Sequence, residues 1–172
     1  MATAKPKKII DDVCEAQLTN PELKAGMVKL IEFSRGVKMN PRHAWSNAFT
    51  CNYKGKRVAT FNIGNDIVFI TLYIADEADL ELIILEEPDG NELLMELMNR
   101  NASHCEGCSP SKINNCASAV KLNSTGGKFG FFCSRFNYNS KNPTLHQFKM
   151  IERFIEIRRR YIEAKKAVDK SW

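Results

Sequence analysis

Four of the six cysteines lie close together and form the stretch with the most specific chemistry. Two residues separate Cys105 from Cys108, seven separate Cys108 from Cys116, and sixteen separate Cys116 from Cys133. Thiolates are preferred zinc ligands, and a Cys-x-x-Cys turn can direct two sulfurs at one ion. We therefore predict a structural zinc ion bound by Cys105, Cys108, Cys116 and Cys133, although the later spacing differs from that of a standard zinc ribbon.

Two other states of these thiols stay open: reduced thiols without metal, and a disulfide or redox pair. In a thioredoxin-like site the Cys-x-x-Cys pair opens a helix, whose dipole lowers the thiol pKa. Pro110 and the asparagines after it disfavour a helix after Cys108. A cysteine-dependent redox protein is therefore an alternative to zinc binding. His104 precedes Cys105 directly, and because adjacent residues chelate one ion poorly, we expect it outside the ligand set.

No catalytic motif accompanies the cysteines. The sequence has no Gly-x-Ser-x-Gly, phosphate loop or dinucleotide fingerprint, and His43 and His146 are isolated. We assign no catalytic or cofactor-binding residue and do not expect an enzyme. Cys14 and Cys51 lie outside the cluster at apolar positions, which predicts buried structural thiols.

Length and composition indicate one globular domain. The chain has 172 residues, of which 44% are hydrophobic and 26% charged. We expect residues 1–172 to form a single domain, with a Cys-rich segment, 102–135, inserted before the C-terminal helix. The N-terminus lacks a signal-peptide core, and no run approaches the roughly 18 apolar residues of a membrane span. These features predict a cytoplasmic protein without a membrane partner, in a compartment that keeps thiols reduced.

Charge is unevenly distributed along the chain. Residues 76–96 contain nine acidic and no basic residues, whereas residues 149–170 contain eight basic and four acidic ones. The acidic segment would repel phosphate, and cations near a helix C-terminus complement the helix dipole. The net charge of +5 therefore does not lead us to expect a nucleic-acid partner.

Periodicity predicts the elements that must position these residues. A helix is expected over residues 6–18, with acidic residues between the apolar positions Ile9, Ile10, Val13 and Leu18. Others are expected from Pro21, capped by Asn20, to a stop at Gly36, and over 91–101. The last is expected over 144–168, with the buried stripe Phe148, Ile151, Ile155 and Ile162. Residues 45–53, 57–63 and 66–74 predict an antiparallel meander, with turns at Lys54-Gly55 and Gly64-Asn65. The last of these strands is apolar on both faces, so we expect both to be covered. The predicted fold class is α+β, an antiparallel β-meander with N-terminal helices, a Cys-rich irregular segment and a long C-terminal helix.

Two further expectations concern the Cys-rich segment and the sheet. A second hairpin, from 119–122 to 128–132, would return Cys133 towards Cys116. Aromatic residues of the meander suggest an alternative function, a small-molecule-binding or sensor domain with an aromatic cleft. These residues are Trp45, Tyr53, Phe61, Phe69 and Tyr73.

Short motifs in the C-terminal half carry a resemblance. Cys105-x-x-Cys108, Lys128-Phe129-Gly130 leading to Cys133, and Asn142-Pro143 before a basic helix resemble a group of uncharacterised bacterial cysteine-containing proteins. The meander, residues 44–74, is similar to the small α+β domain of YdhG-like proteins. The whole resemblance covers about residues 20–165. The resemblance implies metal handling or small-molecule sensing. The sequence has no acidic iron site at a matching position, and the acidic segment 76–96 is only a candidate.

Overall fold

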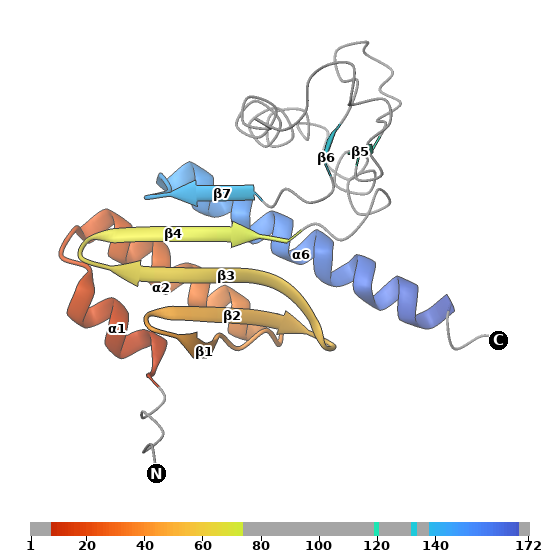
Figure 1. Cartoon of the computed structure of the whole chain (residues 1–172), viewed down its shortest axis with the longest axis horizontal. Coiled ribbons are helices and arrows are strands. Elements are labelled where there is room, and N and C mark those ends of the chain that lie inside the picture. The colour runs from red at the N-terminus through yellow and green to blue at the C-terminus, as the bar shows by residue number, and fades with distance from the viewer. Residues whose placement is uncertain (1–7, 74–118, 121–131, 134–137, 169–172) are drawn as a thin grey trace. The chain divides into compact units, whose positions relative to one another are not determined.

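The computed structural model in Figure 1 describes residues 8–73, 119–120, 132–133 and 138–168. The chain divides into two compact units. The first consists of Met1–Leu72 and Asn139–Trp172, and the second of Tyr73–Tyr138. The predicted insertion, 102–135, lies within the second unit, and the predicted helix over 91–101 lies outside the described residues.

The first unit is built on a five-stranded antiparallel sheet with the strand order β1-β2-β3-β4-β7. Two-residue turns join its first four strands, so neighbours in sequence are neighbours in the sheet. The strands are β1 (Arg42–Trp45), β2 (Ala48–Tyr53), β3 (Lys56–Gly64), β4 (Ile67–Leu72) and β7 (Tyr138–Lys141).

Three helices accompany the sheet: α1 (Ile10–Gln17), α2 (Pro21–Gly36) and α6 (Leu145–Val168). They lie on one side of the sheet in Figure 1, and α2 contacts both α1 and α6. This arrangement confirms the predicted α+β class, with N-terminal helices, an antiparallel sheet and a long C-terminal helix.

The core lies between the helices and the inner face of the sheet. Phe49 pairs with Phe61 across β2 and β3, and Phe61 pairs with Ile70 across β3 and β4. All three side chains are fully buried, as are Met27 and Leu30 of α2. The alternation of strand side chains explains why residues two apart share this face.

The boundaries of α2 follow from local chemistry, as predicted. The side chain of Asn20 accepts hydrogen bonds from the amides of Glu22 and Leu23, at 3.0 and 3.1 Å. Pro21 occupies the first helical position, where no amide hydrogen is needed. The helix ends at Gly36.

A close approach between helices fixes α2 against α6. A Cβ atom added at Gly26 would lie 2.3 Å from Cε2 of Phe148. Real Cβ atoms do not approach other atoms this closely, so only glycine fits at position 26. The buried stripe predicted for α6, Phe148, Ile151, Ile155 and Ile162, is confirmed, and its first turn closes with reciprocal bonds between Thr144 and Gln147.

Two predicted boundaries in the meander are wrong. Residues 42–53 form two strands instead of one, because Ser46 and Asn47 make a turn in which Ser46 has φ +48°. The β3–β4 turn is Asn65-Asp66, one residue later than predicted, with φ +49° and +57°. Asn and Asp tolerate this left-handed conformation, so Gly64 can remain in β3. The Lys54-Gly55 turn is as predicted.

The prediction that both faces of β4 are covered is also wrong. Val68, Ile70 and Leu72 are buried, whereas Ile67 and Phe69 on the opposite face remain 42% and 36% exposed. The three helices cover one face, and an antiparallel sheet tolerates solvent on the other.

The edge strand β7 was not predicted from the sequence. It lies next to β4, and Asn142 continues the pairing: its amide donates to the carbonyl of Val68, and its side-chain oxygen accepts from the amide of Val68, both at 2.7 Å. This places the start of α6 directly after the sheet edge.

Candidate functional site

Most of the predicted zinc ligands fall outside the described residues. Cys105, Cys108 and Cys116 belong to the part of the chain that the structure does not describe, and so does His104. Cys133 lies in the strand β6 (Phe132–Cys133) of the second unit. Among the residues that the structure describes, no group of three or more His, Cys, Asp or Glu side chains is arranged to hold a metal ion.

A short hairpin in the second unit pairs the backbone of Cys133 with that of Ala119. Strand β5 (Ala119–Val120) pairs antiparallel with β6, with Ala119 opposite Cys133 and Val120 opposite Phe132. This pairing agrees with the predicted hairpin where the chain is described, at 119–120 and 132–133, and the remaining residues of the predicted arms, 121–122 and 128–131, lie outside the described residues. The backbone of Cys133 therefore lies opposite a residue only three positions after Cys116.

Cys14 and Cys51 are buried, as predicted, and both are free cysteines. Burial raises the pKa of Cys14 to about 11 and that of Cys51 to about 12. The thiolate is the reactive and metal-binding form of cysteine, so neither residue is suited to nucleophilic chemistry at neutral pH.

The two described histidines have no catalytic partner among the described residues. The Nε2 atom of His43 lies 2.9 Å from the carbonyl oxygen of Ser46, and its ring packs against Phe49 with centroids 5.6 Å apart. His43 therefore supports the β1–β2 hairpin. His146 is exposed on the first turn of α6.

The aromatic residues proposed to line a cleft do not share one face of the sheet. Phe61 is buried in the core opposite Ile70 of β4. Phe69 directly precedes Ile70 and pairs with Asn62, so it lies on the outer face of the sheet. Tyr53 is buried and Trp45 is 54% exposed. Phe61 and Phe69 are therefore on opposite faces of the sheet, so the five side chains, all of which the structure describes, do not share one surface.

An ion-pair network, here called the Tyr53 cluster, links the β2–β3 turn to α6. It consists of Tyr53, Lys54, Glu156, Arg159 and Glu163. Arg159 donates two hydrogen bonds to Glu156, at 2.8 and 2.9 Å, and one to Glu163 at 3.0 Å. The hydroxyl of Tyr53 donates to Glu163, and Lys54 lies 3.6 Å from the same carboxylate.

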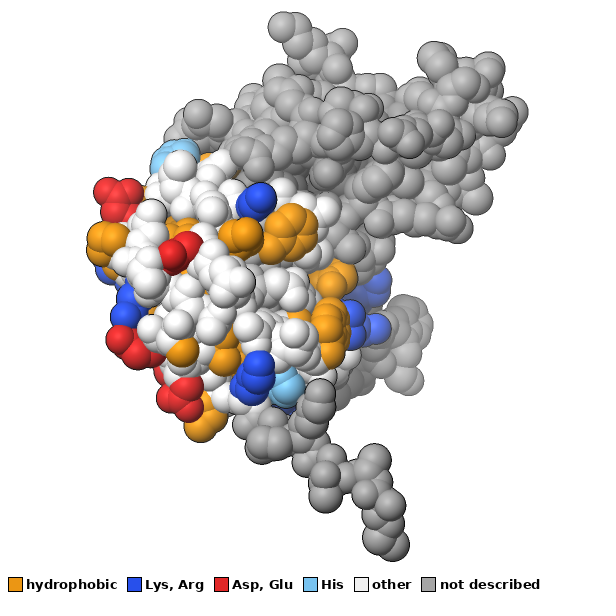
Figure 2. Space-filling view, turned by 60° about the vertical axis from the view of Figure 1, so that its left-hand side comes forward, with side chains coloured by type: hydrophobic (Ala, Val, Ile, Leu, Met, Phe, Trp, Pro, Cys, Tyr) orange, Lys and Arg blue, Asp and Glu red, His pale blue; other side chains and the backbone are white. Residues whose placement is uncertain are grey.

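These contacts give part of the basic α6 segment a structural role. Hydrogen bonds from Arg159 hold the pKa of Glu156 below its usual range, and the bond from Tyr53 does the same for Glu163. On the face in Figure 2, acidic and basic side chains of the described residues are interspersed. The guanidinium of Arg159 is committed to carboxylates and is not presented for a phosphate backbone.

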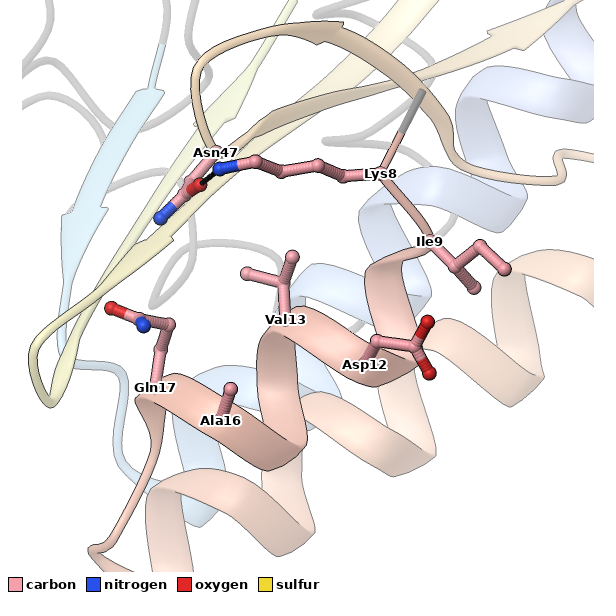
Figure 3. A pocket seen from close by; sticks show the side chains of 7 residues that line it. All are labelled: Lys8, Ile9, Asp12, Val13, Ala16, Gln17 and Asn47. Atoms are coloured by element: carbon pink, nitrogen blue, oxygen red, sulfur yellow. Dashed lines mark hydrogen bonds between the residues drawn. The ribbon is translucent and has the colours of Figure 1, made fainter. Parts of the chain in front are cut away.

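A surface pocket of about 340 Å³ lies beside α1. One face of α1 lines the pocket, together with Lys8 and Ile9, which precede the helix, and Asn47, which belongs to the β1–β2 turn (Figure 3). We call it the α1 pocket. Ile9 was predicted to be an apolar helix position, but it precedes the helix and is 60% exposed at the pocket. The volume of the α1 pocket falls at the lower end of the range for small-molecule sites.

Sequence reasoning missed this pocket because its two ends are far apart in the chain. Gln17 and Asn47 have no shared motif, and only the contacts of α1 with the sheet bring them together. The polar face of the predicted first helix was the one available signal.

Comparison with known proteins supplies no relative from which a role could be transferred. No protein-family model, no curated protein and no solved structure matches this chain. A search for helices long and apolar enough to cross a membrane, limited to the described residues, finds none. The function of the chain must therefore be argued from its own residues.

Proposed function

We propose that this chain is a cytoplasmic, non-enzymatic α+β protein that binds a structural zinc ion through the thiolates of Cys105, Cys108, Cys116 and Cys133. The observation that carries the proposal is the register of the β5–β6 hairpin, with Ala119 opposite Cys133.

The hairpin shortens the distance in space between the third and fourth ligands, Cys116 and Cys133. Paired residues of antiparallel strands have Cα atoms about 4.5–5.5 Å apart. Cys116 precedes Ala119 by three residues, a stretch of at most roughly 11 Å. The sixteen residues between Cys116 and Cys133 are thus bridged by strand pairing, and a turn before Ala119 suffices to bring the two cysteines to one ion.

Four thiolates would close the coordination of zinc and leave no open position for substrate or water. Such a site stabilises structure and does not catalyse a reaction. The ligand count also agrees with the inert state of Cys14 and Cys51, whose burial removes them from competition for the metal. A reducing compartment would keep the four ligand thiols available.

Metal analysis of protein purified without added zinc tests the proposal. We expect about one equivalent of zinc, slow reaction of the clustered thiols, and release of four reactive thiols when a chelator removes the metal. Cys108→Ser should abolish stoichiometric zinc, whereas Cys14→Ser, as the matched control, should retain it. Less than half an equivalent of metal, with four thiols that titrate freely before chelation, would contradict the proposal.

A further inference from the structure

The α1 pocket presents two side-chain amides whose orientation is fixed by the protein. The Oε1 atom of Gln17 accepts a hydrogen bond from the backbone amide of Asn65 at 3.2 Å. The Oδ1 atom of Asn47 accepts one from the ammonium group of Lys8. Because both amide oxygens are engaged, each NH₂ group is the part left to face a ligand.

Both NH₂ groups are available among the described residues. Neither the Nε2 atom of Gln17 nor the Nδ2 atom of Asn47 donates a hydrogen bond to another described residue. The two amides flank one point, since a Cβ atom added at Gly64 would be 3.7 Å from Nδ2 of Asn47 and 3.9 Å from Oε1 of Gln17. With the ammonium of Lys8, which has further N–H donors, they form a donor-rich end of the pocket.

The other end of the pocket carries a hydrogen-bond acceptor with negative charge, the carboxylate of Asp12. Asp12 lies five residues before Gln17 on α1, a separation of about 7.5 Å along the helix axis. Figure 3 shows Asp12 and Gln17 at opposite ends of the pocket, with Val13 and Ala16 between them. The exposed Ala16, with the remaining exposed 8% of Val13, offers an apolar surface between them.

We propose that the α1 pocket binds a small amino carboxylate, a zwitterion with its carboxylate at Gln17, Asn47 and Lys8 and its ammonium group at Asp12. Carboxylates accept hydrogen bonds and match the donor-rich end. An ammonium group pairs with the Asp12 carboxylate, which would repel a simple carboxylate ligand. The short apolar chain between the two groups lies on Val13 and Ala16. This inference does not depend on the zinc site.

Titrations followed by two-dimensional NMR test the proposal with three matched probes: 5-aminopentanoate, pentanoate and pentylamine. We expect saturable shifts of the amides around Gln17 and Asn47 with 5-aminopentanoate, weaker binding of pentanoate, and no saturable shift with pentylamine. Equal binding of pentylamine, or no saturable shift with any probe, would overturn the proposal.

Two substitutions remove the donors and keep the internal hydrogen bonds. In Gln17→Glu and Asn47→Asp, a carboxylate oxygen still accepts from Asn65 or Lys8, but the NH₂ group that faces the ligand is replaced by a second oxygen. Each variant should fold and should bind 5-aminopentanoate at least about tenfold more weakly, the size expected for loss of a charge-assisted bond.

Asp12→Asn tests the other end. We expect it to remove the preference for 5-aminopentanoate over pentanoate and to leave pentanoate binding intact or stronger. Glu15→Gln is the matched control, because Glu15 is an exposed acid on the same helix that pairs with Lys24 and does not line the pocket. If Glu15→Gln changes the preference as much as Asp12→Asn does, the assignment of the ammonium site to Asp12 is wrong.

Discussion

The carboxylate of Asp66 accepts hydrogen bonds from both the backbone amide and the hydroxyl group of Thr19. Asp66 belongs to the β3–β4 turn, and Thr19 to the linker between α1 and α2. The amide of Asn20 donates to the same carboxylate at 3.0 Å, and the amide of Asp66 donates to the carbonyl of Gln17 at 2.9 Å. Asp66 thus both accepts and donates hydrogen bonds, which connect the β3–β4 turn to the linker between α1 and α2, next to the α1 pocket.

The stability of the protein should depend on pH through Asp66. The hydroxyl of Thr19 and the amides of Asn20 and Thr19 hold the pKa of Asp66 below its usual range. A carboxyl group with a lower pKa in the folded state stabilises the fold above its unfolded pKa, about 4, and loses this effect as the pH falls through the folded pKa. We expect Asp66→Asn to be less stable than the native chain at neutral pH. The difference in stability between the two proteins should shrink below about pH 4.

Urea denaturation over a pH series measures this effect. Asparagine tolerates the φ of +57° at position 66, so backbone strain does not obscure the result. Thr19→Val, which removes the hydroxyl donor, should reduce the same pH dependence, and the double variant should add little to Asp66→Asn alone. An unchanged acid profile in Asp66→Asn would show that the contact does not control stability.

Gly26→Ala should destabilise the protein by about 1–3 kcal/mol, the usual cost of overpacking a core. The added methyl group would overlap the ring of Phe148 and force α2 and α6 apart. The free energy of unfolding in urea reports the loss.

Gly36→Ala is the matched control, because a Cβ atom at Gly36 would meet no heavy atom within 4 Å. It should be neutral or slightly stabilising, since alanine favours the helix. Combining Gly26→Ala with Phe148→Leu should cost less than the sum of the two single changes. If the two changes were simply additive, the cost of Gly26→Ala would not arise from contact with Phe148.

Cys14 and Cys51 should resist alkylation in the native protein at about pH 8, since burial raises the pKa of Cys14 to about 11 and that of Cys51 to about 12. Mass spectrometry after a brief pulse of iodoacetamide identifies which residues react. Both should react rapidly once the protein is unfolded in urea. Native-state labelling as fast as in urea would refute their buried, inert role.

Arg159→Met should destabilise the protein by up to about 1 kcal/mol, the range of surface ion pairs, because it removes bonds to Glu156 and Glu163. The difference in unfolding free energy should shrink in high salt, which screens these charges. Lys24→Met breaks the isolated exposed pair with Glu15 and should cost less. An equal effect of the two changes would mean that the Tyr53 cluster does not act as a network.

The sequence by itself determined the features that depend on near neighbours. Asn20 and Pro21 begin α2 and Lys54-Gly55 turns β2 into β3, because caps and tight turns need only a few adjacent residues. The apolar period of α6 predicted its buried stripe for the same reason. The clustered cysteines also come from sequence alone, and their use as zinc ligands remains a prediction.

Tertiary structure decided what depends on residues distant in the chain. Strand β7 has no apolar alternation, and it forms because β4 offers an open edge and Asn142 bonds to Val68. The exposure of Phe69 depends on which face the helices cover. The α1 pocket exists because the packing of α1 on the sheet brings Gln17 near Asn47, and because hydrogen bonds from Asn65 and Lys8 orient their amides. No local pattern encodes such an arrangement, since its geometry arises only when separate elements pack together.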